Sequence, residues 1–149
     1  MKIHRLQFSI DIEAERSAIW QALWEDSSYR EWTAVFAEGS HAVTDHWKEG
    51  SKVLFLAPDR SGIYSIVERH VPNEVMKFRH LGLVTAGQEQ PLDDTTRQWS
   101  GTTESYTLTE GEQGTTLAVE IDVLDEHLDF MKDTFPRALK KVARLSVRR

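Results

Sequence analysis

The last third of the chain constrains the fold most, because a strand pattern there is followed directly by a long helical pattern. Leu117, Val119, Ile121 and Val123 alternate with mostly polar neighbours, which is typical of a strand with one buried face. Apolar residues then recur at intervals of three and four, as one face of a helix requires: Leu128, Met131, Phe135, Ala138, Leu139, Val142 and Leu145. We therefore predict a sheet with one wet face, whose other face is covered by this helix.

The start of the chain adds one strand and two short helices. Four apolar residues at alternate positions predict the strand: Leu6, Phe8, Ile10 and Ile12. Four apolar residues at helical spacing predict the first helix: Ile19, Trp20, Leu23 and Trp24. The polar run Asp26-Ser27-Ser28 offers capping groups for a second short helix that carries Tyr29 and Trp32.

Turn signals divide residues 41–123 into about six strands. These signals are Glu49-Gly50, the run from Pro58 to Gly62, Pro72-Asn73 and the run from Glu110 to Gly114. Short segments between such turns favour an antiparallel meander. Within it, Met76, Phe78 and His80 share one face of a strand. With the first strand, the sheet has about seven strands, and the fold class is α+β.

Two segments break these patterns. Residues 82–98 lack periodicity and are long for a connection between strands, so we predict a flexible flap there. Pro136 lies inside the C-terminal helical run, where it removes a backbone hydrogen bond and clashes with the preceding turn. We therefore expect the helix to kink at Pro136 or to begin again there, with Thr134 as a candidate cap.

Length and charge limit the organisation and the partners. A chain of 149 residues without a linker or a repeat predicts one domain that spans residues 1–149. The formal charge of −6 argues against nucleic acid, since that affinity rests on lysine and arginine neutralising phosphates. No segment approaches the roughly 20 apolar residues that span a bilayer, and the first residues lack the apolar stretch of a signal peptide. Together with the absence of cysteine, this favours the cytoplasm and no membrane insertion.

Several short motifs, in their order along the chain, resemble the helix-grip fold of the START and birch-pollen-allergen superfamily. The motifs are Ile12-Glu13-Ala14 with Ile19-Trp20 and Trp32, Ile66-Val67-Glu68 with Pro72, Gly114-Thr115-Thr116-Leu117, and Phe135-Pro136 with Ala138-Leu139. Together they are most similar to the branch named after the activator of heat-shock-protein-90 ATPase. The resemblance covers nearly the whole chain.

This resemblance implies a curved antiparallel sheet wrapped around the long C-terminal helix, with a cavity between them for a small hydrophobic or amphipathic ligand. It also implies two alternatives, a chaperone-associated regulator that acts through its surface and a cyclase- or hydrolase-like enzyme that uses polar cavity residues. The C-terminal stretch is basic: Lys132, Arg137, Lys140, Lys141, Arg144, Arg148 and Arg149. These cations suit an acidic protein partner, or they only complement the dipole of the helix.

The sequence contains no motif of an established active site. A Gly-x-Ser-x-Gly elbow, a phosphate-binding loop and a dinucleotide fingerprint are all absent. His41 and His46 are five residues apart on a predicted strand and would face opposite ways, so we expect neither a metal site nor a cofactor. Glu68 and His70 would share one face of a strand, either as a proton-transfer pair or as an ordinary polar pair at a strand end.

The remaining candidates are residues of the predicted cavity. His80 shares its face with apolar neighbours, so it is either an anchor for the polar group of a ligand or a satisfied core histidine. Trp99 and Tyr106 each combine an apolar body with a polar tip. In an enzyme, His80, Tyr106 and Glu68 would be the residues to test, but the sequence favours a binding protein. The predicted ligand contacts are Met76, Phe78, His80, Trp99, Tyr106, Val119, Met131 and Phe135.

Overall fold

The computed structural model describes residues 2–44 and 46–147 of the chain. Arg148 and Arg149 of the basic stretch lie outside the described residues. In chain order the elements are β1 (Ile3–Ile12), α1 (Arg16–Trp24), α2 (Asp26–Thr33), β2 (His41–Val43), β3 (Lys52–Leu56), β4 (Gly62–Val71), β5 (Val75–Thr85), β6 (Gln88–Glu89), α3 (Asp94–Arg97), β7 (Thr103–Gly111), β8 (Gly114–Leu124), the 3-10 turn η1 (Asp125–His127) and α4 (Leu128–Val147).

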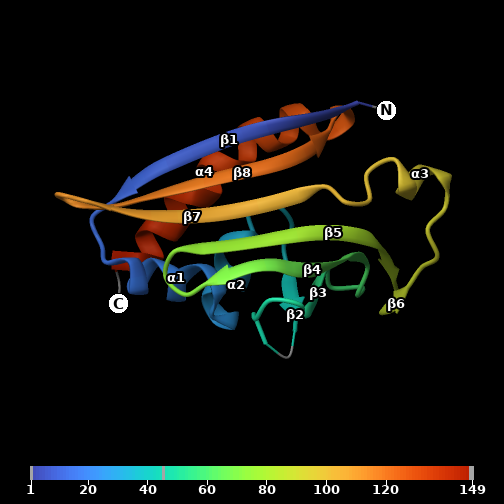
Figure 1. Cartoon of the computed structure of the whole chain (residues 1–149), viewed down its shortest axis with the longest axis horizontal. Helices are drawn as coiled ribbons and strands as arrows, with labels where there is room; N and C mark the ends of the chain where they lie inside the picture. Colours follow the sequence, from blue (N-terminus) through green and yellow to red (C-terminus); the bar gives the residue numbers. More distant parts are fainter. Residues whose placement is uncertain (1, 45, 148–149) are drawn as a thin grey trace.

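The strands form one antiparallel sheet with the order β1-β8-β7-β5-β4-β3-β2. β1 pairs with β8 although they lie at opposite ends of the chain, with Leu6 opposite Ile121 and Ile12 opposite Thr115. The helices α1, α2 and α4 gather on one face of the curved sheet (Figure 1). This confirms the predicted α+β helix-grip fold; the sheet has eight strands rather than about seven because the short β6 pairs with β5.

The two short helices predicted after β1 are present, but the second is not capped as expected. The cap position of α2 is Glu25, whose side chain makes no capping bond, and Asp26 is already helical. The Ser28 hydroxyl instead donates to the backbone oxygens of Gln21 and Glu25, which joins α2 to the end of α1. The indole N–H of Trp32 donates to the oxygen of Leu23 at 3.1 Å and fixes the same corner.

Of the two alternatives expected at Pro136, a kink or a new start of the helix, the second was wrong, because α4 continues through Pro136 as one helix. Thr134 is fully buried inside the helix rather than at a cap. Pro136 lies on the exposed side of α4, next to the buried Phe135. The carbonyl that loses its partner belongs to the exposed Lys132, where water can satisfy it. Burial of the apolar stripe on the opposite side therefore outweighs the local cost of proline.

The segment 82–98 was predicted as an irregular flap, but much of it has regular structure. β5 continues to Thr85, and a tight turn at Ala86 and Gly87, both with positive φ, returns the chain into β6. The side chain of Asp93 then accepts a hydrogen bond from the backbone N–H of Thr96 at 2.8 Å and caps α3. The connection is thus held by a hairpin and a capped turn of helix.

The buried face of the sheet and the helices share one apolar core. Met76, Phe78 and His80 lie on this face, as the alternation in β5 predicted. α4 packs against both α1 and β1, so the C-terminal helix closes the core from the side opposite the sheet. Within the described part of the chain, every helix is too short or too polar to cross a membrane.

Candidate functional site

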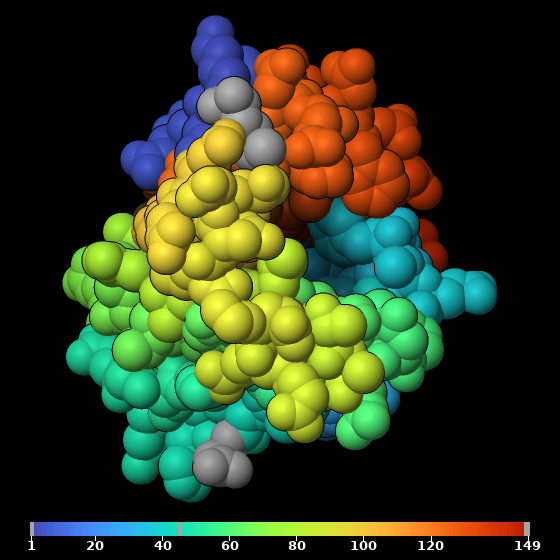
Figure 2. Space-filling model, turned by 90° about the vertical axis from the view of Figure 1, so that its right-hand side faces the viewer, coloured from blue at the N-terminus to red at the C-terminus, as the bar shows by residue number. Residues whose placement is uncertain are grey.

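A cavity of about 520 Å³ lies between the sheet and the helices α2 and α4. It opens on the side of the molecule shown in Figure 2, where a hollow lies between the orange start of α4 and the cyan segment that follows α2. Nine aromatic side chains contribute to its walls: Trp24, Tyr29, Trp32, Phe36, Phe55, Phe78, Trp99, Tyr106 and Phe135. Such a volume and such a lining are typical of a site for one small molecule.

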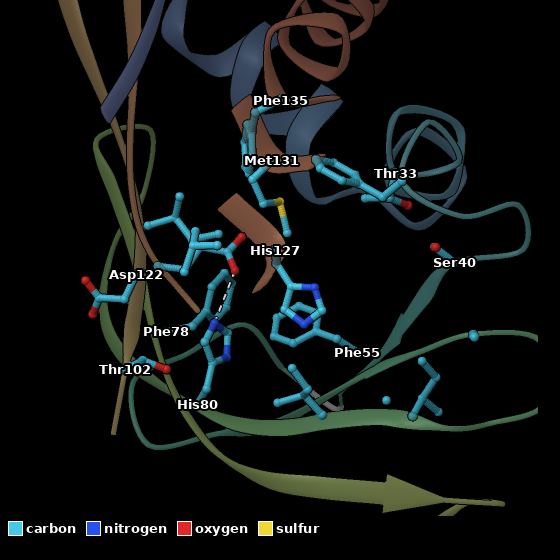
Figure 3. A pocket seen from close by; sticks show the side chains of 18 of the residues that line it. Thr33, Ser40, Phe55, Phe78, His80, Thr102, Asp122, His127, Met131 and Phe135 are labelled. Carbon is cyan, nitrogen blue, oxygen red and sulfur yellow. Dashed lines mark ion pairs between the residues drawn. The ribbon is translucent and has the colours of Figure 1, made fainter. Parts of the chain in front are cut away.

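One polar cluster interrupts the aromatic wall. Nε2 of His80 lies 3.2 Å from Oε1 of Glu104, an approach marked by the dashed line in Figure 3. The Tyr106 hydroxyl donates to the other oxygen of the same carboxylate. On the far side of the imidazole, Nδ1 lies 2.6 Å from the hydroxyl oxygen of Ser65. The four side chains contact one another in the order Ser65, His80, Glu104, Tyr106, with hydrogen bonds at the two ends and the close approach of His80 and Glu104 in the middle.

Sheet register brings these residues together. Ser65 on β4 lies directly opposite His80 on β5, and a register shift between Tyr64 and Ser65 sets this pairing. On the other side of β5, Glu104 of β7 lies opposite Phe78. Neighbouring strands are about 5 Å apart, so side chains at these positions on one face come within hydrogen-bond reach. The cluster is therefore built on the middle of the sheet rather than on loops.

The cluster lies in a buried environment. Ser65 is fully buried, His80 is 8% exposed, and the Glu104 side chain keeps 19% exposure toward the cavity. Burial, together with the nearby Glu104 charge, raises the pKa of Tyr106 well above its ordinary value. The same two causes raise the pKa of Tyr29 on α2. Both phenols therefore stay protonated near neutral pH, and each hydroxyl can donate a hydrogen bond.

A second carboxylate, Asp122, touches the cavity wall but does not join the cluster. Its side chain points away from the cavity in Figure 3 and binds Arg5 and the backbone N–H of Thr103 on the outer face of the sheet. Burial works to raise the pKa of Asp122, but the bonds from Arg5 and Thr103 outweigh it and lower that pKa. Asp122 is therefore an ionised and paired group of the outer face.

Histidines at the mouth do not form a metal centre. His127 lies beside Met131 at the cavity mouth in Figure 3, and His41 lines the opposite side, where its Nδ1 lies 3.0 Å from the Gly39 oxygen. Among residues 2–44 and 46–147, no group of three potential ligands is close enough to hold a metal ion. His46, which was weighed with His41 as a metal ligand, is exposed and does not line the cavity.

Most of the predicted ligand contacts surround one cavity. Six of them line it: Phe78, His80, Trp99, Tyr106, Met131 and Phe135. The other two, Met76 and Val119, are buried in the core and do not belong to the cavity lining. Their burial fits the predicted face of each strand. Contact of any of the eight with a ligand stays a prediction.

The predicted pair of Glu68 and His70 was wrong, because a β-bulge separates the two side chains. The register between β4 and β5 shifts between Val67 and Arg69, so Glu68 is the extra residue of the bulge. Glu68 turns outward and binds Arg79 and Lys77, and the hydrogen bond from Arg79 is the main cause that lowers its pKa. His70 instead stacks on Trp20, with ring centroids 5.6 Å apart. Glu68 therefore cannot serve the cavity.

Sequence reasoning missed Glu104 and Ser65, although a signal for both was present. Glu104 shares the period-two face of the buried residues Tyr106 and Leu108 on β7. Ser65 likewise shares the buried face of Val67 on β4. Extending each alternation by one step places both polar side chains inside. A carboxylate on the buried face of a strand points to a functional or paired group, because carboxylates are rarely buried without a partner.

Comparison with known proteins supports the fold. No family model matches the chain, and no curated protein matches it either. Among solved structures, an uncharacterised protein from Rhizobium leguminosarum is similar at 11% identity and a TM-score of 0.70, over 99% of this chain and 97% of that chain. A protein from Mesorhizobium loti is similar at 16% identity and a TM-score of 0.72, over 97% and 98%. The Aha1 dimer from Colwellia psychrerythraea is similar at 21% identity and a TM-score of 0.61, over 97% and 92%. At these identities the likeness establishes the helix-grip fold alone.

Proposed function

We propose that this protein binds one small, mainly apolar molecule in the cavity between the sheet and α4. The observation that carries the proposal is a cavity of about 520 Å³, rich in aromatic side chains, with the polar cluster of His80, Glu104 and Tyr106 in its wall. Binding sites for small molecules have volumes of roughly 300–1,000 Å³ and combine apolar walls with a few placed polar groups. Protein interiors are normally closely packed, so an open space of this volume inside the molecule supports the same function.

The polar cluster gives such a ligand an orientation. Glu104, His80 and Tyr106 all present polar atoms at one part of the wall, while the rings of Phe36 and Phe135, which pack on each other, line another part. A ligand with one polar end would place that end at the cluster and its apolar body among the rings. Met131, from the first turns of α4, lies at the mouth and would contact the entering molecule.

A neutral apolar dye tests this function. N-phenyl-naphthylamine fluoresces when it enters an apolar site, and one dye should bind per protein chain. Met131→Trp places a larger side chain in the mouth and should weaken binding by about tenfold or more, whereas Lys132→Trp on the exposed neighbouring position should not. Equal binding by both variants, or no saturable binding by the unmodified protein, would contradict the proposal. Native mass spectrometry of protein from its own cells would then identify the natural occupant.

A second candidate function is acid–base catalysis in the same cavity. The observation that favours it is the contact between His80 and Glu104, since an imidazole held by a carboxylate is suited to proton transfer. Glu104 takes the place that the sequence had suggested for Glu68. A molecule found to bind in the cavity and then to be converted would support this function. His80→Gln should abolish the conversion while the dye still binds.

A third candidate is a chaperone-associated regulator that acts through its surface. It is supported by the motif resemblance described above and by the structural likeness to the Aha1 dimer. The exposed cations on α4, such as Lys140 and Arg144, would face an acidic partner. Co-purification with heat-shock-protein-90, lost on Lys140→Glu with Arg144→Glu, would favour this function over ligand binding.

A further inference from the structure

The hydrogen bond of the Ser65 hydroxyl bears on which nitrogen of His80 carries a proton. The Ser65 hydroxyl is fully buried, and within the described residues its one hydrogen-bond partner is Nδ1 of His80. The hydroxyl hydrogen therefore has an acceptor only when Nδ1 carries no proton. An imidazolium, or the tautomer with its proton on Nδ1, would leave a buried donor unsatisfied, at a cost of about 1–3 kcal/mol. This hydrogen bond favours the form in which Nδ1 carries no proton and the imidazole proton lies on Nε2.

When His80 is in this neutral form, the carboxylate of Glu104 has no cationic partner in the cluster. Nε2 of His80 lies 3.2 Å from one oxygen of Glu104, and Tyr106 donates its hydroxyl to the other. Neither group carries a positive charge in that form, so the charge of the carboxylate is not neutralised. Each oxygen still has a lone pair available, since an ionised carboxylate offers about four acceptor positions.

The composition of the cavity wall does little to offset the negative charge of Glu104. Among the described residues that line the cavity there is no lysine and no arginine. Asp122, which also touches the wall, is paired with Arg5 on the outer face. Glu104 would therefore repel an anionic ligand, such as a fatty acid or a phosphate ester, and no lysine or arginine of this lining would offset that repulsion. In an apolar surrounding this repulsion is stronger than in water.

Aromatic rings of the cavity lining also suit a cation. Tyr29, Trp32 and Phe36 all line the cavity, and Trp32 lies 6.3 Å from Tyr106 between ring centroids. The negative faces of such rings attract ammonium groups, by about 0.5–2 kcal/mol each. The charge of Glu104 also contributes to the raised pKa of Tyr29 on the opposite helix, so its field crosses the cavity.

We propose that the occupant of this cavity is an apolar molecule with one positive charge, such as a protonated amine, and that Glu104 binds this cation. The inference rests on the proposed binding function and narrows its ligand class. The ammonium would donate to the remaining lone pairs of Glu104, while the apolar body lies among the rings. This charge-assisted bond is stronger than a bond to a neutral hydroxyl at the same place.

Three probes with the same naphthyl ring and different charge test the proposal. Naphthylmethylamine is a cation, naphthylmethanol is neutral and naphthoate is an anion near pH 7, and calorimetry measures the affinity of each. We expect the amine to bind about tenfold or more tightly than the alcohol, and naphthoate more weakly than the alcohol. Glu104→Gln should abolish the difference between amine and alcohol without weakening the alcohol. Glu120→Gln, the same change on the outer face of β8, should leave the difference intact.

The outcomes separate this inference from the binding function itself. If the alcohol binds as tightly as the amine to the unmodified protein, the cation is not recognised and the inference is overturned, while ligand binding stands. If none of the three probes binds, the proposed function fails and the inference fails with it. Persistence of the amine preference in Glu104→Gln would assign the cation to another group and would overturn the role of Glu104. The comparison on the unmodified protein decides the charge question even if Glu104→Gln does not fold.

Discussion

The ring of Phe135 on α4 lies parallel to the ring of Phe8 on β1, with 5.0 Å between the ring centroids and 12° between the planes. Phe135 also meets Phe36 edge to face at 5.1 Å and is 2% exposed. It therefore ties the C-terminal helix to the first strand and to the segment after α2. We predict that Phe135→Ala lowers the free energy of unfolding by about 3–5 kcal/mol, because it removes buried contacts and leaves a cavity.

Chemical denaturation followed by circular dichroism measures this change. Phe130→Ala is the matched control, because Phe130 lies on the same helix but is 48% exposed. It should change the free energy of unfolding by less than about 1 kcal/mol. Equal losses for the two variants would mean that the stack of Phe8 and Phe135 does not hold α4 in place.

Pro136 offers a prediction of the opposite sign. Proline in the interior of a helix is about 3 kcal/mol less favourable than alanine, and α4 continues through this exposed position. Part of that cost is offset, since proline also restricts the unfolded chain. We expect Pro136→Ala to stabilise the protein by about 1–3 kcal/mol in a urea titration, with Lys140→Ala on the exposed side within about 0.5 kcal/mol of the original. A loss of stability would instead mean that proline sets a local geometry that the core requires.

The fold was predictable because its main signals are local. The alternation in β8 and the spacing of Phe135, Leu139 and Val142 in α4 report directly which side of each element is buried. The same spacing also explains why α4 can continue through Pro136, because this residue lies off the apolar stripe and faces solvent. The hairpin at Ala86 was missed for a physical reason, since alanine rarely adopts positive φ and gives no turn signal.

The site was only partly predictable, because it depends on register between strands that are distant in sequence. Nothing in the residues around Glu68 marks a bulge, yet that bulge turns Glu68 outward and separates it from His70. The partners of His80 come from β4 and β7, and only the sheet order places Ser65 and Glu104 on either side of it. Alternation gives the face of each side chain, whereas pairing decides which side chains meet.

The stack of His70 on Trp20 predicts a dependence of stability on pH. Burial lowers the pKa of His70 below its ordinary value of 6.5, so the unfolded chain binds this proton more readily than the folded protein. The stability that this group contributes is complete above about pH 6.5 and is lost as pH falls through the lower folded pKa. Urea midpoints between about pH 7.5 and 5 should therefore decrease for the unmodified protein.

Two variants isolate the contribution of His70. His70→Gln should flatten this decrease, since glutamine does not titrate. His46→Gln, at an exposed position, should keep the original pH dependence. If His70→Gln loses stability with falling pH as steeply as the unmodified protein, another group causes the effect.

The last prediction concerns Ser65, which acts on the cavity only through His80. Ser65→Ala removes the donor to Nδ1 and leaves a buried acceptor unsatisfied, so we expect a loss of about 1–3 kcal/mol in the free energy of unfolding. Ser146→Ala is the control, because that equally buried hydroxyl only shares the Val142 oxygen within α4. It should cost about 0.5 kcal/mol or less.

Stability alone would not distinguish packing from positioning, so nitrogen NMR of labelled histidine supplies the second measurement. In the unmodified protein, His80 should carry its proton on Nε2, as the acceptor role of Nδ1 toward Ser65 requires. Ser65→Ala removes this constraint, so the tautomer on Nδ1 should gain population, and in that form the nitrogen that faces Glu104 carries no hydrogen. An Nδ1-protonated His80 in the unmodified protein would contradict the hydrogen-bond pattern and, with it, the unpaired charge that we assign to Glu104.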